Sequence, residues 1–439
     1  MIDLFWFRRD LRLFDNAGLY HALKKGKNVQ PIFIFDRSIL DKLEDKSDKR
    51  VEFIHNQLKF LKEQLNELGS DLWVFHGTPE SVYKKIIKDH SIQTVWTNRD
   101  YESYALTRDG KIKDLLEKKN IGFQSFKDQV IFEKGEVLKK DGLPYTVFTP
   151  YKRKWLEKLD SRVMGKQSYY LSSYPSADYN HNYNKTSSSP LLSLTDIGFK
   201  ESAIRTPGTE VNQQLIRNYD RDRDYPAIAG TSRLGMHFRF GTISIREKAR
   251  KARKLNDIYL SELVWRDFYS QILANFPHVE KNAFRKKYEQ IEWRNNESEF
   301  LAWCEGQTGY PLVDAGMREL NQTGHMHNRV RMVAASFLTK HLLIDWRWGE
   351  AYFAKKLLDF DLASNNGGWQ WAAGCGTDAA PYFRIFNPTS QMEKFDKEKK
   401  YIKKWIPEWG TDGYPQPIVE HKKARERCLA TYKKALKQL

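Results

Sequence analysis

The sequence predicts an α/β N-terminal domain with a parallel, Rossmann-like sheet, joined by a long linker to an all-helical C-terminal domain. In the first third, short apolar runs alternate with helical stretches; a segment rich in Ser, Tyr, Asn and Pro follows, and strand patterns then largely vanish. At 439 residues the chain is also too long for one ordinary core. We therefore expect domains at 1–130 and 201–439, with a linker at 131–200.

The first domain has four candidate strands and one clear helix. The candidate strands are the apolar runs Ile2–Phe7, Pro31–Phe35, Leu72–Phe75 and Thr94–Trp96. Apolar residues recur every three or four positions from Val51 to Leu68, as on one face of a helix, and Gly69 is expected to end it. Strands that alternate with helices form mostly parallel sheets covered on both faces.

The charge balance restricts the class of partner. The chain has 73 Lys and Arg against 56 Asp and Glu, a net charge of +17. This excess favours a polyanion such as nucleic acid or an anionic membrane, although a merely soluble basic protein remains an alternative. No uncharged apolar run is long enough to span a bilayer, and the N-terminus has no apolar signal core. The three scattered cysteines suit a reducing compartment, so we expect a cytoplasmic protein, or a nucleoid-associated one in a bacterium.

Tryptophan is concentrated in the predicted helical domain. Seven of the 13 lie between Trp265 and Trp371. A core position is the simpler interpretation of each one alone. Several have charged or polar neighbours, however, and aromatic rings among basic groups can stack a base or a flavin beside phosphates.

One helical stripe combines a carboxylate, an indole and a guanidinium. Glu262, Trp265, Arg266 and Tyr269 are spaced i, i+3, i+4 and i+7, which places them on one face. They suit the wall of a pocket for a flat, hydrogen-bonding ligand. A simple i,i+4 ion pair between Glu262 and Arg266 on a solvated face fits the spacing equally well.

The segment 359–371 reads DFDLASNNGGWQW. Its acid pair, Asp359 and Asp361, has no supporting ligand cluster, so no metal is expected. The adjacent asparagines and glycines predict a tight turn where backbone approaches a ligand. Trp369 and Trp371 should point to different sides of the chain. With no nucleophile, acid–base or metal motif in the sequence, we expect a cofactor that carries the chemistry.

Five motifs in order resemble the photolyase/cryptochrome family. They are FWFRRDLRLFDNAGL at 5–19, GTSRLG at 230–235, ELVWRDFY at 262–269, TGYPLVDAGMREL at 308–320 and NNGGWQWAAGCGTDAAPYFRIFNP at 365–388. The resemblance implies an N-terminal antenna domain and a helical, FAD-binding catalytic domain. It further implies a class I carbon–carbon lyase that repairs cyclobutane pyrimidine dimers in UV-damaged DNA. We expect this enzyme to be a monomer that does not associate with a membrane. Excited, fully reduced FAD would donate an electron to a flipped-out dimer.

The resemblance also assigns roles to residues. Catalysis falls to Glu262, Met332 and Asn365, and the electron-transfer chain to Trp293, Trp346 and Trp369. The implied FAD-binding residues are Tyr219, Thr231, Ser232, Arg233, Leu234, Gly235, Tyr259, Arg266, Asn328, Arg331, Asp359, Phe360, Asp361 and Asn365. The implied contacts to the dimer and DNA are Glu262, Trp265, Asn328, Arg329, Trp371 and Gln391.

Within the family, cyclobutane dimers are favoured as the substrate. Enzymes for (6-4) photoproducts resemble one another in a histidine pair, where this chain has Asn328 and Met332. The alternatives are (6-4) repair and a cryptochrome-type blue-light photoreceptor. A photoreceptor usually adds a long C-terminal extension, whereas this chain stops soon after the last motif.

Some positions depart from the family pattern. Gly235 replaces the usual serine of the flavin loop, and His325 stands where related bacterial enzymes often have Trp. Tyr104 and Ala105 replace the Asn and Glu of folate-using relatives. A second, antenna chromophore of unknown identity is therefore expected to be a folate, a deazaflavin or another flavin, or to be absent.

Overall fold

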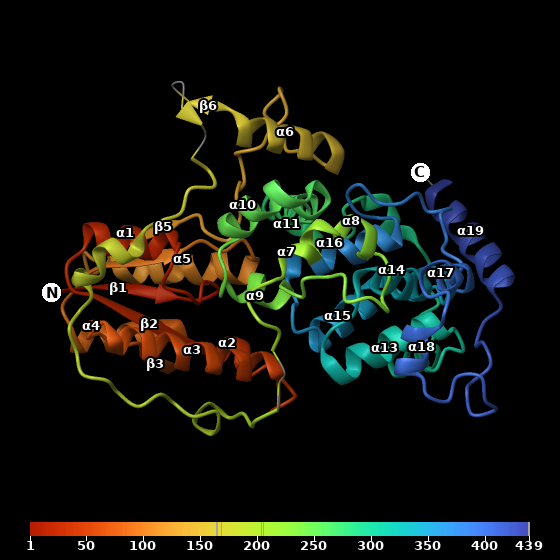
Figure 1. Ribbon diagram of the computed structural model, residues 1–439, viewed down its shortest axis with the longest axis horizontal. Coiled ribbons are helices and arrows are strands. Elements are labelled where there is room, and N and C mark those ends of the chain that lie inside the picture. The colour runs from red at the N-terminus through yellow and green to blue at the C-terminus, as the bar shows by residue number, and fades with distance from the viewer. Residues whose placement is uncertain (164–165, 168, 203, 205, 438–439) are drawn as a thin grey trace. The chain divides into compact units, whose positions relative to one another are not determined.

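The protein forms two compact units in a computed structural model, which describes residues 1–163, 166–167, 169–202, 204 and 206–437 (Figure 1). The first unit contains 1–133, 159–210 and 233–254, and the second contains 134–158, 211–232 and 255–439. Both units are discontinuous in sequence, whereas the expected domains are continuous stretches. No helix among the described residues is both long and apolar enough to cross a bilayer.

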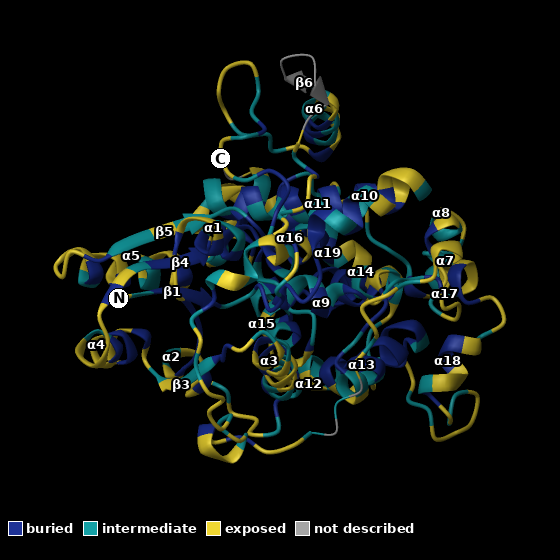
Figure 2. Ribbon diagram, turned by 60° about the vertical axis from the view of Figure 1, so that its left-hand side comes forward, coloured by how far each residue is buried: buried dark blue, intermediate teal, exposed yellow. Residues whose placement is uncertain are grey.

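The first unit contains a parallel sheet, as the sequence predicts, with the four expected strands and a fifth that was not predicted. Its strands are β1 (Ile2–Phe7), β2 (Val29–Asp36), β3 (Trp73–Gly77), β4 (Ile92–Asn98) and β5 (Gly122–Phe126), in the order β3-β2-β1-β4-β5. β2 is buried throughout and β1 nearly so (Figure 2), which explains their continuous apolar sequences. β5 escaped prediction because it begins with glycine and is only half-buried at the edge of the sheet.

Helices connect the strands of this sheet. They are α1 (Ala17–Lys25), α2 (Arg37–Leu40), α3 (Lys49–Glu67), α4 (Pro79–Asp89) and α5 (Ser103–Glu117). The helix predicted from Val51 to Leu68 is α3, and Gly69 follows it with a φ of 72°, as expected of a C-terminal glycine. Later elements of the unit are β6 (Arg162–Val163), β7 (Lys166–Gln167), η1 (Ser176–Asn182), η2 (Thr195–Ile197), α9 (Gly235–Phe240) and most of α10 (Ile245–Leu255).

Every regular element described in the second unit is helical, which confirms the predicted class. Those that begin before residue 300 are α6 (Phe148–Asp160, except its last two residues), α7 (Gln213–Arg217), α8 (Tyr219–Asp222), α11 (Asp257–Asn275), η3 (Pro277–Glu280), η4 (Lys286–Gln290) and α12 (Glu297–Glu305). After it come α13 (Pro311–Thr323), α14 (Asn328–Ser336), η5 (Phe337–His341), α15 (Trp346–Lys356), α16 (Leu362–Ala373), α17 (Pro388–Phe395), α18 (Lys400–Trp405) and α19 (His421–Lys437). Helix α16 packs against α11, α14 and α15.

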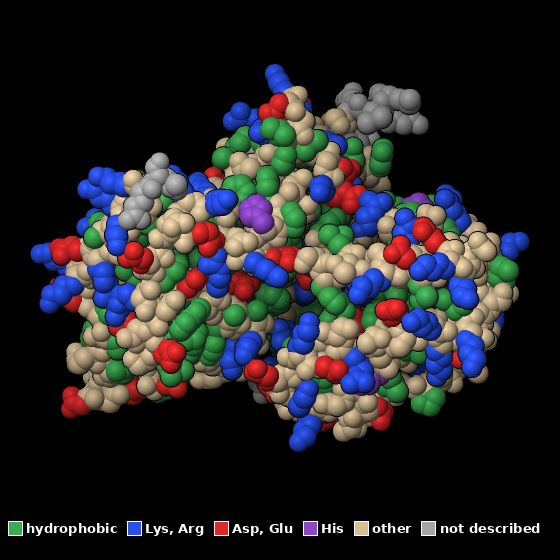
Figure 3. Space-filling model, turned by 180° about the vertical axis from the view of Figure 1, so that it is seen from behind, with side chains coloured by type: hydrophobic (Ala, Val, Ile, Leu, Met, Phe, Trp, Pro, Cys, Tyr) green, Lys and Arg blue, Asp and Glu red, His purple; other side chains and the backbone are tan. Residues whose placement is uncertain are grey.

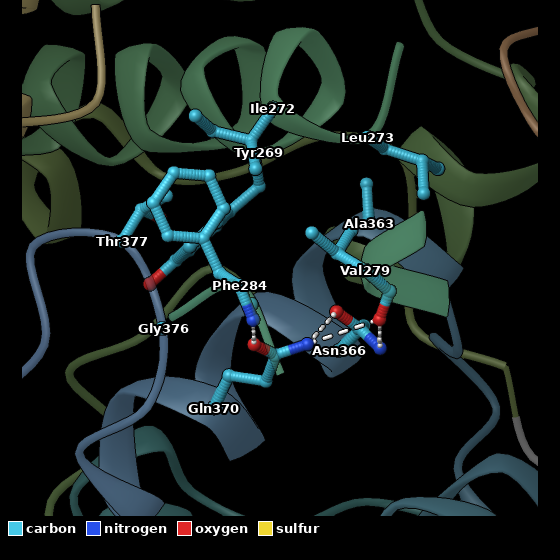
Figure 4. A pocket seen from close by; sticks show the side chains of 11 residues that line it. Tyr269, Ile272, Leu273, Val279, Phe284, Ala363, Asn366, Gln370, Gly376 and Thr377 are labelled. Atoms are coloured by element: carbon cyan, nitrogen blue, oxygen red, sulfur yellow. Dashed lines mark hydrogen bonds between the residues drawn. The ribbon is translucent and has the colours of Figure 1, made fainter. Parts of the chain in front are cut away.

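The prediction of a tight turn at the Asn-Asn-Gly-Gly sequence is wrong. These residues lie inside helix α16. Gly367 is required there because a Cβ would lie 2.2 Å from the Tyr269 ring on α11. Asn366 Nδ2 and Gln370 Nε2 both donate to the Val279 carbonyl, at 2.9 and 3.0 Å (Figure 4). Contacts between helices therefore outweigh the local preference of these residues for a turn.

Candidate cofactor and substrate site

The predicted stripe on helix α11 is its half-exposed face. Glu262, Trp265, Arg266 and Tyr269 are all partly exposed, whereas the residues between them are buried. The Trp265 ring stacks on Phe148, with centroids 3.6 Å apart and an angle of 7° between the planes. The face thus presents a carboxylate and ordered aromatic rings beside solvent, as a pocket wall requires.

Glu262 is held by a residue that the sequence did not single out. Arg223, which follows α8, donates from Nη1 to Glu262 Oε1. Its guanidinium lies 5.6 Å from the Tyr219 ring centroid, and Tyr219 meets Tyr259 edge to face at 5.0 Å. Tyr259 donates its hydroxyl to Ser232 Oγ at 3.1 Å. Four residues predicted from the resemblance are therefore joined in one cluster, and burial raises the pKa of both tyrosines.

Helix α14 supplies the second group of predicted residues. Arg331 Nη2 donates to both carboxylate oxygens of Asp359, at 3.1 and 2.9 Å, and its Nε donates to the Met326 carbonyl. The Asn328 amide lies 3.9 Å from Met332 Sδ, so these two predicted residues adjoin one turn apart. The Arg331–Asp359 pair offers donors and acceptors to a ligand that carries both.

Helix α16 supplies the third group. Asp361 caps its N-terminus by accepting from the Ser364 backbone N–H at 3.1 Å. Asn365 Nδ2 donates to Glu350 Oε1 at 2.8 Å, and burial raises the pKa of that carboxyl. Glu350 was not predicted, because a single glutamate on a helix gives no signal in the sequence.

The predicted electron-transfer tryptophans differ in exposure. Trp369 and Trp346 are each only 2% exposed and share one hydrophobic cluster, and Trp293 packs against it half-buried. Trp369 has its ring contacts with Trp303 at 6.0 Å and Phe353 at 5.0 Å. Trp371 is half-buried and lies 6.5 Å from Phe386. Trp369 thus lies inside the cluster, whereas Trp371 packs against it partly buried, so the two differ in exposure.

The residues of the predicted flavin loop are divided between the two units. Thr231 and Ser232 belong to the second unit, whereas Arg233, Leu234 and Gly235 belong to the first. Arg233 has a φ of 52°, the left-handed conformation, and Gly235 begins helix α9. Within the first unit, Tyr104 donates its hydroxyl to Asp36; burial, then that carboxylate, raises the pKa of Tyr104 to about 12.

The donor set of the second unit fits FAD. Hydroxyls from Ser232 and the two tyrosines suit phosphate and ribityl oxygens, and the amide, guanidinium and carboxylates on α14–α16 suit a ring with both donors and acceptors. Several buried polar side-chain atoms have no hydrogen-bond partner among the described residues, and three of them belong to predicted site residues: Arg329 Nε, Trp369 Nε1 and Gln391 Oε1. Such atoms are rare unless a ligand or water completes them.

Basic residues are spread over the face drawn in Figure 3 rather than gathered in one block. Figure 3 shows Lys and Arg side chains across the visible face, with Asp and Glu between them. With 73 basic against 56 acidic residues, the net field attracts polyanions.

Two family models match the chain. The model described as DNA photolyase matches residues 3–168, and the FAD binding domain of DNA photolyase matches residues 259–411. The second range contains helices α11 to α18 and most of the predicted site residues.

Full-length relatives agree with these matches. The chain is 38% identical to the deoxyribodipyrimidine photo-lyase of Escherichia coli, with 99% of each chain covered. The structure of a bacterial class III photolyase from Agrobacterium tumefaciens is similar with a TM-score of 0.85 and 32% identity, over 99% of this chain and 98% of that one. An archaeal photolyase from Sulfolobus tokodaii, solved with two FAD molecules, gives a TM-score of 0.81 and 36% identity, over 99% and 100%.

Proposed function

The chain belongs to the DNA photolyase family, and from this we propose that it is a class I enzyme that uses light to split cyclobutane pyrimidine dimers in DNA. The cofactor is FAD, fully reduced when active. We further propose a monomer that acts in the cytoplasm, or on the nucleoid of a bacterium. A second chromophore, as in the two-FAD relative, would add a near-UV or violet absorption band to the purified protein.

The observation that carries this proposal is the half-exposed face of α11. Glu262 offers a carboxylate that can accept hydrogen bonds from pyrimidine edges, and Trp265 offers a ring held flat against Phe148. A flipped dimer needs both an acceptor for its base edges and an aromatic surface for its ring faces, because its bases have lost their pairing and stacking partners. Asn328 and Met332, one turn apart on α14, replace the histidine pair of (6-4) enzymes, which favours cyclobutane dimers.

The protein's own residues bind and orient FAD and the dimer. FAD, when bound, supplies the light-driven donation of one electron to the dimer, and the electron afterwards returns to FAD. Tyr219, Thr231, Ser232, Tyr259, Arg266 and Phe360, with Arg233, Leu234 and Gly235, are proposed to hold its phosphate and ribityl parts. Arg331, Asp359, Asp361, Asn328 and Asn365 are proposed around its ring. Glu262 is proposed to orient the dimer in the site by accepting hydrogen bonds from pyrimidine N–H groups. Met332, Arg329, Trp371 and Gln391 complete the dimer contacts.

Binding to damaged and undamaged DNA tests the function. We expect the protein to bind a duplex with one thymine dimer more tightly than the same duplex without it, by fluorescence anisotropy. Both affinities should fall steeply with salt, because phosphate contacts release counterions. Equal affinity for the two duplexes would contradict dimer repair and favour the photoreceptor alternative.

Replacing Glu262 by Ala should lower the repair yield and leave the flavin content unchanged, because its proposed partner is the dimer. Loss of a charge-assisted hydrogen bond costs about 1.5–3 kcal/mol, or roughly 10- to 100-fold. The measurement is dimer repair per absorbed photon, with flavin absorbance per protein as the second readout. Glu262→Gln, which keeps an acceptor oxygen, should lose less. Loss of FAD in Glu262→Ala would show instead that the residue supports the structure through Arg223.

A further inference from the structure

A short run of alternating charges begins in the last two residues of helix α8, continues past its end and links two elements of the proposed dimer site. The run is Arg221-Asp-Arg-Asp224, and its last two residues, Arg223 and Asp224, contact side chains on different helices. A charge run of this kind usually lies on a solvated surface. Arg221 is exposed in this way, but the last two residues are only partly exposed, with 27% of the Arg223 side chain and 37% of the Asp224 side chain accessible.

Asp224 is positioned between two guanidinium groups. Its Oδ1 accepts a hydrogen bond from Arg329 Nη2 on α14 at 2.7 Å. The same oxygen lies 3.9 Å from Arg223 Nε, and Arg223 in turn pairs with Glu262 on α11. The order Glu262–Arg223–Asp224–Arg329 alternates in sign and sums to zero.

Arg329 is held closely at the end of this chain of charges. Only 17% of its side chain is exposed, and its guanidinium lies 4.3 Å from the ring centroid of Phe395. A phosphate that approached Arg223 or Arg329 would therefore compete with a carboxylate already in contact. Partly buried charges are screened less by salt than exposed ones, so this competition persists at physiological ionic strength.

Neutralised arginines at the site matter for discrimination between damaged and undamaged DNA. Contacts to phosphates are the same for every duplex, so each free arginine increases non-specific binding. Specificity is a difference of affinities, and it improves when binding to the wrong ligand is weakened. A flipped dimer can form hydrogen bonds with Glu262, and these offset the free energy lost when the Glu262–Arg223 pair breaks. An undamaged strand forms no such hydrogen bonds.

We propose that Asp224 is a specificity-determining residue, which keeps Arg223 and Arg329 neutralised until a dimer engages Glu262. The proposal rests on the repair function proposed above. Asp224 acts through the two arginines and is a positioning residue rather than a catalytic one. Once a dimer engages Glu262, Arg223 keeps only the 3.9 Å contact with Asp224, which is weak enough for Arg223 to bind a phosphate even with Asp224 in place.

The test replaces Asp224 by Asn in the full-length holoprotein. Affinities for a duplex with one thymine dimer and for its undamaged copy are measured by anisotropy over a range of salt. One additional phosphate contact should raise affinity for the undamaged duplex about fivefold at about 0.15 M salt, and should steepen the salt slope by about 0.9. The dimer duplex should gain less, so the ratio of the two affinities falls.

Asp220→Asn is the matched control. Asp220 lies on α8, four residues before Asp224, and the substitution removes the same charge, but the Asp220 carboxylate accepts from an uncharged partner, Asn256 Nδ2, at 2.8 Å. It should change both affinities equally and leave the ratio unchanged, and Asp224→Glu should restore the ratio. If Asp224→Asn fails to fold, Asp224→Ser makes the same test without an amide to satisfy.

The outcomes separate the two proposals. A ratio in Asp224→Asn equal to that of Asp220→Asn would overturn the role of Asp224, although the wild type still preferred the dimer. A wild type without that preference would overturn the repair function itself.

Discussion

Replacing Trp293 by Phe should slow light-driven reduction of oxidised FAD roughly tenfold or more, equal to about 1.4 kcal/mol or more in the barrier. Repair measured after chemical reduction of the flavin should stay near the wild-type rate. The substitution removes an oxidisable indole from the proposed chain and keeps an aromatic ring. Flavin absorbance under steady blue light, with a thiol as the external reductant, gives the first quantity.

The position of Trp293 permits this substitution. Its ring is half-buried against the main cluster of the second unit and meets Tyr432 edge to face at 6.1 Å. Phenylalanine fills most of that space, so the packing loss should be on the order of 1 kcal/mol. A folded protein with normal flavin content is therefore expected.

Trp371→Phe is the opposite case. Because Trp371 lies on the half-exposed side of α16 near Phe386, it should affect binding of the dimer and leave photoreduction unchanged. If Trp293→Phe and Trp371→Phe gave the same phenotype, the division between electron transfer and dimer binding would be wrong.

A line of aromatic rings from Trp369 to Trp348 offers an alternative route for the electron that would bypass Trp293. Trp369 contacts Trp303 at 6.0 Å, Trp303 stacks on Phe300 at 5.9 Å, and Phe300 contacts the half-buried Trp348 at 5.2 Å. If Trp293→Phe retained photoreduction, adding Trp348→Phe should abolish it. If the double variant were still active, neither line of rings would carry the electron.

The sequence predicted the elements whose signal is local. Continuous apolar runs marked β1 and β2 because these strands are buried along their length, and the spacing from Val51 to Leu68 marked α3. Contacts between distant segments left no such signal. The Asn-Asn-Gly-Gly sequence in α16 has turn propensities, and only its contact with Tyr269 on α11 explains the helix.

The same limit applies to the site. The stripe on α11 followed from helical spacing, and most other site residues followed from the family resemblance. Arg223 and Asp224 were missed because alternating charges indicate a solvated surface when read without tertiary contacts. The sequence also did not predict that each unit is assembled from separate stretches of the chain. Periodicity identifies a helix or strand but not the elements that pack against it.

Asp128→Ala should destabilise the first unit by about 3–5 kcal/mol, because it removes the carboxylate that pairs with the buried Arg12 guanidinium and leaves the buried Arg246 guanidinium with Asp15 alone. Arg12 Nη2 donates to Asp128 Oδ2 at 2.7 Å, and Arg246 Nη2 donates to Oδ1 at 2.8 Å. Both arginine side chains are at most 5% exposed. Arg246 also bonds Asp15 at 2.9 Å, so one network joins the segment after β1 to helix α10.

The pH dependence of unfolding measures independently how much this network contributes to the free energy of unfolding. Burial opposes ionisation of Asp128, but the two arginines outweigh it and lower its pKa to about 2. A carboxyl with a lowered folded pKa contributes its full stability above its unfolded value of about 4. That contribution should be lost as the pH falls from about 4 towards 2, and Asp128→Asn should lack this part of the acid transition.

Asp41→Ala is the matched control for Asp128→Ala, because Asp41 also pairs with an arginine of the first unit, Arg37, at 3.1 Å. The difference is exposure: 57% of the Arg37 side chain and 55% of the Asp41 side chain are accessible to solvent. Solvent screening and side-chain entropy reduce such a pair to about 0.5 kcal/mol or less. The urea midpoint for unfolding of the first unit can be measured by limited proteolysis at each urea concentration. This midpoint should therefore fall strongly in Asp128→Ala and scarcely change in Asp41→Ala. Similar small shifts for both would mean that water reaches the Arg12–Asp128–Arg246 network and that its burial does not determine the stability of this unit.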